Sequence, residues 1–157
     1  MRKLTTYLIC GLLLLLAACE TIDCTLYNTV GLKARFYSQG AAVSITDTLT
    51  ISACGTDSVL LNRAVSASDV TLPMSFWQAA DTFLLRVEGD GYVLADTLCV
   101  QKTNTPHFES PDCPSTMFHQ ITAVSCSRTF IDSVVIVQSS VNFSQFENIQ
   151  IHLRSGD

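Results

Sequence analysis

Two histidines and two cysteines in the C-terminal half of the chain are residue types that bind zinc. They are His107, Cys113, His119 and Cys126, and a Cys₂His₂ set can hold a structural zinc ion. Such sites usually bring their ligands in pairs two to four residues apart, and no such pair occurs among these four. We therefore expect no metal site and no cofactor.

Recognisable catalytic motifs are missing as well. The sequence contains no G-x-S-x-G, H-E-x-x-H or glycine-rich phosphate loop. The acidic stretch Glu88–Gly91 lacks the repeated oxygen ligands of a calcium loop and fits a hairpin turn better. A hydrolase would need His107 or His119 to meet a carboxylate in a pocket. We predict no catalytic residue and a non-enzymatic protein, with a hydrolase as the weakest alternative.

The aromatic pair Phe76-Trp77 is the best candidate for ligand contact. On a strand, two consecutive side chains point to opposite faces, so one of the two must face outward. An exposed Trp77 could form a platform for a sugar, although packing against a loop or a sheet edge is the commoner use of such a ring. A glycan- or ligand-binding accessory protein is therefore the alternative function.

The pattern Asp-Ser/Thr-apolar occurs five times. One explanation is local, because Asp ends turns through side-chain hydrogen bonds and β-branched residues then open strands. The other is that the pattern resembles the acceptor motif for general O-glycosylation of exported proteins in Bacteroidota-type bacteria. The candidate acceptors are Thr48, Ser58, Thr82, Thr97 and Ser133.

The N-terminal segment has the layout of an export signal. A basic Met1-Arg2-Lys3 precedes an uncharged apolar run over 7–16, which is shorter than the roughly 20 residues that span a bilayer. The following Leu16-Ala17-Ala18-Cys19 resembles a bacterial lipobox, which implies cleavage between Ala18 and Cys19 and lipid on the Cys19 thiol. Two or three acyl chains hold a protein firmly on a membrane. We predict a removed signal over 1–18 and membrane anchoring through Cys19.

The charge of the chain limits its possible partners, and its cysteine content bears on its redox environment. The chain carries 14 acidic and 9 basic side chains, and the signal removes two of the basic ones, so the mature protein is strongly acidic and unsuited to nucleic acid or anionic lipid head groups. An exported chain meets an oxidising compartment, where disulfides are expected. Five cysteines remain besides Cys10 and Cys19, so at least one is free or pairs elsewhere. They are Cys24, Cys54, Cys99, Cys113 and Cys126.

The rest of the chain alternates between apolar and polar residues with a period of two, which is typical of half-buried antiparallel strands. Turn residues separate the runs, and no helical period follows residue 18. We predict a single antiparallel β-sandwich, immunoglobulin-like or transthyretin-like, with seven to nine strands over 26–157, after a tether at 19–25. The clearest runs cover 32–37, 70–76, 83–88 and 148–154, with further runs near 48–52, 58–61, 92–100, 118–124 and 131–138.

These features together resemble uncharacterised lipoproteins of Bacteroidota that form a family of unknown function. The resemblance rests on the lipobox, Cys24, a strand ending Arg35-Phe36-Tyr37, and a series of C-terminal motifs. That series comprises Ser110-Pro111-Asp112-Cys113, Phe118, Ile131–Ile136, Val141-Asn142 and Glu147-Asn148-Ile149. Pro114 departs from the Gly that such proteins often carry after the Cys, and Cys54, Cys99 and Cys126 are extra. The family implies no enzymatic activity.

The resemblance implies a disulfide between Cys24 and Cys113. Closing so long a loop would contribute about 4–5 kcal/mol in the chain-entropy model, and it would pin the domain within about 18 Å of the lipid. Glu20 rather than Asp follows Cys19, which favours the outer membrane and leaves periplasmic and surface orientations open. We therefore expect a non-catalytic envelope lipoprotein with a structural or interaction role and an unknown protein or glycan partner.

Overall fold

The protein is an all-β sandwich without a helix in the part of the chain that the structure describes. A computed structural model describes residues 30–56, 58–111, 113–144 and 146–155. The eleven strands in these ranges are β1 (Gly31–Ser38), β2 (Ala41–Ala42), β3 (Thr48–Ala53), β4 (Val59–Ala64), β5 (Asp69–Pro73), β6 (Ala80–Gly89), β7 (Tyr92–His107), β8 (Thr116–Cys126), β9 (Ile131–Ile136), β10 (Ser140–Val141) and β11 (Ile149–Leu153).

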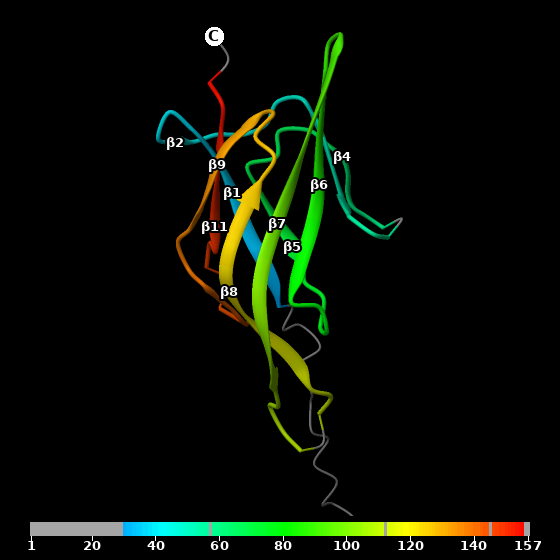
Figure 1. Ribbon diagram of the computed structural model, residues 1–157, viewed down its shortest axis with the longest axis vertical. Coiled ribbons are helices and arrows are strands. Elements are labelled where there is room, and N and C mark those ends of the chain that lie inside the picture. Colours follow the sequence, from blue (N-terminus) through cyan, green and yellow to red (C-terminus); the bar gives the residue numbers. More distant parts are fainter. Residues whose placement is uncertain (1–29, 57, 112, 145, 156–157) are drawn as a thin grey trace, which may run out of the picture.

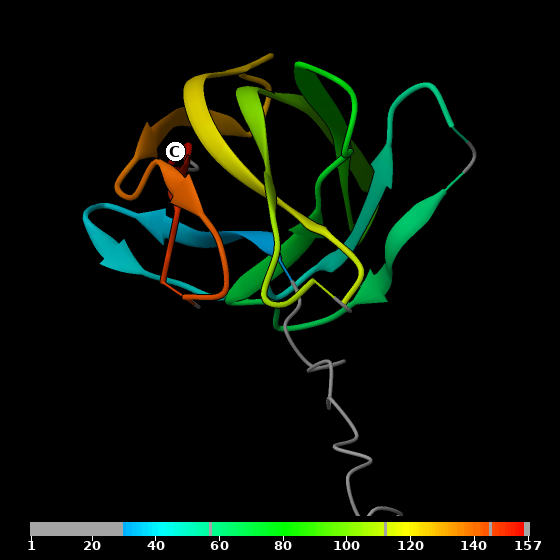
Figure 2. The ribbon, with the colours of Figure 1, turned by 90° about the horizontal axis from the view of Figure 1, so that it is seen from below.

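The strands form two sheets that face each other across one core (Figures 1 and 2). One sheet has the order β2-β1-β11-β9, with β5 also paired to β1, and the other has the order β10-β8-β7-β6-β3-β4. The predicted sandwich is confirmed. Its strand number exceeds the expected seven to nine because the structure also contains very short strands, β2 and β10. β1 and β11 run parallel, which departs from the all-antiparallel expectation.

The period-two pattern marks the residues that fill the core. Leu32, Ala34 and Phe36 of β1 are buried, and so are Phe83, Leu85 and Val87 of β6. The predicted hairpin at Glu88–Gly91 joins β6 to β7, with Gly89 opposite Tyr92. Gly91 lies there at φ 81°, a conformation that glycine adopts without steric cost.

The run expected over 70–76 ends earlier than its alternation suggests. Val70, Leu72 and Met74 are buried as predicted, but β5 stops at Pro73. Phe76 and Trp77 therefore lie in the loop before β6, and both are exposed. The prediction that only one of them would face outward was wrong, because it assumed a strand at these residues.

Candidate functional site

The 74–79 loop, which joins β5 to β6, presents the most exposed large apolar side chain among the described residues. Trp77 is 87% exposed and Phe76 is also exposed. Exposing an indole forgoes the free energy that its burial would contribute, and a loose loop could fold the ring back onto the protein. An exposed Trp77 therefore requires contacts that hold the 74–79 loop in place.

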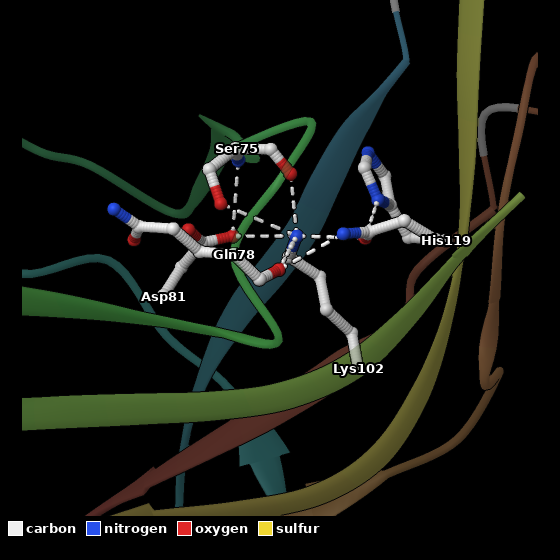
Figure 3. Close-up of polar contacts among 6 residues, drawn as sticks. Ser75, Gln78, Asp81, Lys102 and His119 are labelled. Atoms are coloured by element: carbon white, nitrogen blue, oxygen red, sulfur yellow. Dashed lines mark hydrogen bonds and ion pairs between the residues drawn. The ribbon is translucent and has the colours of Figure 1, made fainter. Parts of the chain in front are cut away.

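Lys102 of β7 lies beneath the loop and is buried (Figure 3). Its ammonium group donates to the backbone oxygen of Ser75, to the backbone oxygen of Gln78 at 2.9 Å and to Oδ1 of Asn104 at 2.8 Å. An ammonium has three protons, so these acceptors saturate it. One buried cation thus binds both the beginning and the end of the Trp77 loop.

Asp81, at the start of β6, completes the charge balance. Its Oδ2 lies 3.4 Å from Lys102 Nζ and accepts a hydrogen bond of 3.1 Å from the backbone N–H of Ser75. Both carboxylate and ammonium are buried, and a buried charge requires such a partner. The pair therefore holds Ser75 through both its N–H and its carbonyl group.

Asn104 and His119 extend the cluster across β7 and β8. Asn104 donates to the Gln78 oxygen at 2.9 Å, and its Oδ1 lies 2.8 Å from Nδ1 of His119. Because an amide oxygen only accepts, Nδ1 of His119 carries the proton. Burial, reinforced by the positive charge of Lys102 and opposed by Asp81, lowers the pKa of His119 to about 4. His119 is thus neutral near pH 7.

We call Lys102, Asp81, Asn104 and His119 the clamp. Its contacts hold the 74–79 loop in place. A general base needs a free lone pair that can reach a substrate proton, but Lys102 is saturated, and His119, whose free lone pair is on Nε2, is buried. The other histidine proposed for hydrolysis, His107, stacks on Phe118 with ring centroids 4.1 Å apart. The arrangement thus favours a role in fixing the loop over a role in proton transfer.

A shallow pocket of about 320 Å³ opens beside the loop. Its lining includes Ser75, Gln78 and Asp81 from the loop side and Cys54 and Thr56 from the β3–β4 turn. Polar atoms and an exposed thiol therefore lie next to the Trp77 loop, and a polar ligand could contact both.

Two of the five Asp-Ser/Thr motifs have structural explanations. Asp81 belongs to the clamp, and the buried Asp96 binds the β8–β9 connection. Its carboxylate accepts from Ser127 Oγ and from the backbone N–H groups of Thr129, Phe130 and Ile131 at 2.6–2.8 Å. Burial raises the pKa of Asp96, but these hydrogen bonds outweigh it and bring the net pKa below its usual value.

The candidate acceptor hydroxyls themselves occupy outward positions. Ser58 and Thr97 are exposed, whereas Thr48, Thr82 and Ser133 are half-buried. Asp81 and Asp96 lie within β6 and β7, where each buried carboxylate binds another segment and the next residue points to the opposite face of the sheet. O-glycosylation at the five sites stays a prediction.

The cysteines do not assemble a metal site within the described ranges, where no group of three or more His, Cys, Asp or Glu could hold an ion. His119 and Cys126 lie seven residues apart on β8, which separates them by about 23 Å. Cys54, Cys99 and Cys126 are free thiols, and Cys113 is not one of them. Cys19, Cys24 and the cleavage site at Ala18 lie outside the described residues, so lipidation and the Cys24–Cys113 pairing remain predictions.

Sequence reasoning missed the clamp, although a signal for it was present. Alternate residues of β7 point into the core, namely Asp96, Leu98, Val100 and Lys102. A lysine therefore stands at a position where the alternation predicts a buried side chain. A charge at such a position requires a buried partner. Which partner it meets depends on the loop from another strand.

The comparisons with known proteins assign the family. Within the described residues, no helix has the length and apolar character needed to cross a membrane. No curated protein and no solved structure was found to match the chain. Residues 48–153, more than half of the chain, match a family of unknown function. The chain therefore belongs to this family of unknown function, DUF6452.

Proposed function

We propose that the protein is an envelope lipoprotein of the Bacteroidota type, with a β-sandwich that acts as a non-catalytic interaction module. The observation that carries the proposal is the sequence Leu16-Ala17-Ala18-Cys19 directly after an uncharged apolar run. That order supplies a signal over 1–18 for export and a thiol for lipid. The absence of Asp after Cys19 favours the outer membrane, with a periplasmic or a surface orientation.

The Trp77 loop supports the interaction role. A buried ion pair carries a large desolvation cost, and here that cost is incurred to hold a loop whose own aromatic side chains stay exposed. Protein–protein interfaces are enriched in Trp and Tyr, which often carry much of the binding free energy. The clamp therefore supports a role of the Trp77 loop in binding a partner.

Metabolic labelling with a palmitate analogue tests the anchor. We expect the full-length protein to take up the label and to sediment with the outer-membrane fraction. Cys19→Ser should abolish both results, and Cys24→Ser, five residues further on, is the matched control that should keep the label. An unlabelled wild-type protein in the soluble fraction would contradict the proposal.

Glycan binding is the second candidate, and the exposed Trp77 beside a polar pocket favours it. Sugars stack on flat aromatic faces while their hydroxyl groups bind polar neighbours. On a glycan array, we expect the wild-type protein to bind one class of glycan. Trp77→Ala should lose this binding, and Val93→Ala, which changes an exposed residue of the β6–β7 hairpin, should keep it. Equal binding by both variants would exclude a Trp77 platform.

Glycosylation is proposed for the protein itself at Thr48, Ser58, Thr82, Thr97 and Ser133. Intact-mass analysis of the native protein should then show hexose-sized additions. Ser58→Ala and Thr97→Ala, at the two exposed sites, should remove the largest share of that mass. A native mass equal to that of the lipidated polypeptide would rule the modification out.

A further inference from the structure

Four aromatic side chains project into solvent from three different loops. We call them the aromatic rim: Phe76 and Trp77 in the 74–79 loop, Phe108 between β7 and β8, and Phe146 between β10 and β11. Every exposed phenylalanine or tryptophan of the described residues belongs to this set. Four such rings from separate parts of the sequence require an explanation beyond the occasional apolar surface residue.

Strand pairing places the three loops at one end of the sandwich. Pro73 pairs with Gly31, so the 74–79 loop begins beside the start of β1. Asn148, just after the loop of Phe146, donates its backbone N–H to the oxygen of Lys33 at 2.9 Å. Figure 1 shows the β7–β8 connection at the same end, and the β6–β7 hairpin at the opposite one.

Side-chain contacts join these loops to one another. Phe143, near the loop of Phe146, contacts both His107 and Phe118 at the base of the β7–β8 hairpin. Lys102 and Asn104 of β7 hold the carbonyl groups of the 74–79 loop. The rim is therefore carried by mutually supported segments.

The lipid attachment point lies close to this end. Val30, the residue just before β1, follows Cys19 by eleven positions, and that length of chain reaches at most about 36–40 Å. β6 alone rises about 33 Å along the sandwich toward the far hairpin. The tether therefore joins the sandwich at the rim end, so the rim is the end closest to the point of attachment, although a fully extended tether would also span the length of β6.

The chemistry of the rim suits the head-group layer of a bilayer. Tryptophan is enriched at membrane–water interfaces, and phenylalanine is among the apolar side chains that segments lying in the interface bury at the boundary between head groups and acyl chains. The chain is acidic overall, so electrostatic attraction to anionic lipid cannot supply the binding. Insertion of apolar rings needs no such attraction, and zwitterionic lipid is the occupant that fits.

We propose that the aromatic rim rests in the head-group layer of the membrane that anchors Cys19, so that the sandwich stands on this end with the β6–β7 hairpin pointing away. The proposal rests on the lipid anchor of the proposed function. The acyl chains supply attachment, and the rim supplies orientation. The Lys102 clamp then has a purpose, because it keeps Trp77 extended toward the lipid.

Trp77 is the only tryptophan of the chain, so its fluorescence reports on the rim alone. The experiment uses the full-length lipidated protein, purified from membranes and reconstituted into phosphatidylethanolamine–phosphatidylcholine vesicles. The reference is the same protein kept in solution by amphipol, without vesicles. Relative to this sample, the fluorescence emission of Trp77 should shift to shorter wavelength in vesicles. Brominated phospholipids should quench it, and acrylamide quenching should fall about twofold because lipid shields one side of the ring.

The variants keep Trp77 as the reporter. Phe76→Ser/Phe108→Ser/Phe146→Ser should return the emission and the acrylamide quenching to their vesicle-free values while the protein still floats with vesicles. Val93→Ser is the matched control at the opposite end and should behave as the wild type. Circular dichroism checks that each variant keeps its β-structure.

The outcomes separate the two proposals. A protein that floats with vesicles but keeps a water-exposed Trp77, insensitive to brominated lipid, overturns the rim and leaves the anchor intact. A protein that neither carries lipid nor floats overturns the anchor and the rim together. Lipid quenching of Trp77 that persists in the triple phenylalanine variant would also contradict a rim that acts as one surface.

Discussion

Nζ of Lys102 lies 3.4 Å from Oδ2 of Asp81, and the two side chains are buried where β7 and β6 approach the Trp77 loop. The two groups act on the same segment, since Asp81 accepts from the backbone N–H of Ser75 and Lys102 donates to its carbonyl oxygen. Within the described residues, no buried side-chain nitrogen or oxygen lacks a hydrogen-bond partner. The same two side chains thus neutralise each other's charge and hold the 74–79 loop. Changing either residue should therefore both leave a buried charge unpaired and loosen the loop.

Lys102→Met should destabilise the fold by about 3–5 kcal/mol, because it leaves a buried carboxylate without its cation. Lys102→Met/Asp81→Asn should lose less than the sum of the two single changes, since no unpaired charge remains. Urea unfolding followed by circular dichroism measures these free energies. Lys33→Met, a half-buried lysine of β1, is the control and should change stability little. Additive losses in the double variant would show that the ion pair is not the unit of stabilisation.

The sheet architecture could be predicted because strand faces follow from alternation alone. Leu32, Phe36, Phe83 and Leu85 are all buried where the period of two placed them. The Asp90-Gly91 turn was equally readable, because few residues adopt a positive φ easily. Such signals are local, and each depends on only a few adjacent residues.

The clamp and the parallel pairing could not be predicted, because both depend on contacts between distant segments. Lys102 meets Ser75 across 27 positions of sequence, and β1 meets β11 across more than a hundred. Alternation says which face a residue occupies but not which strand lies beside it. The same limit explains the misplaced Phe76, whose apolar character continued the pattern of β5 beyond its last pairing at Pro73.

Asp96→Ala should cost about 2–4 kcal/mol, because four hydrogen-bond donors of the β8–β9 connection lose a charged acceptor. The folded pKa of Asp96 lies below its unfolded value of 3.8. Its contribution is therefore present above that unfolded pKa and is lost as pH falls through the lower folded pKa. Chemical unfolding at pH 7 and below pH 4 should show that the gap between wild type and Asp96→Asn narrows on acidification. Asp132→Asn, at an exposed residue, should show no such narrowing.

His119 should make the free energy of unfolding depend on pH between about 4 and 6.5, above the range in which Asp96 acts. Its pKa is about 4 in the folded protein against 6.5 for the free side chain, so between these values the unfolded chain binds more protons. Stability therefore falls as pH drops from 6.5 to 4, by about 2–3 kcal/mol. His119→Gln should flatten this slope, and His152→Gln should leave it unchanged. A slope that survives in His119→Gln would assign it to other groups.

The cysteines provide a test of exposure and of pairing in one measurement. Cys126 lies opposite Leu98, which is in the core, whereas Cys99 is the next residue along β7 and points to the other face. The two thiols cannot form a disulfide because the sheet lies between them. Maleimide labelling of the native protein should modify the exposed Cys54 fastest and the half-buried Cys99 and Cys126 slowly. Peptide mapping without reduction should then recover Cys24 linked to Cys113, and a bridge from Cys24 to Cys54, Cys99 or Cys126, with that cysteine unlabelled, would refute the pairing.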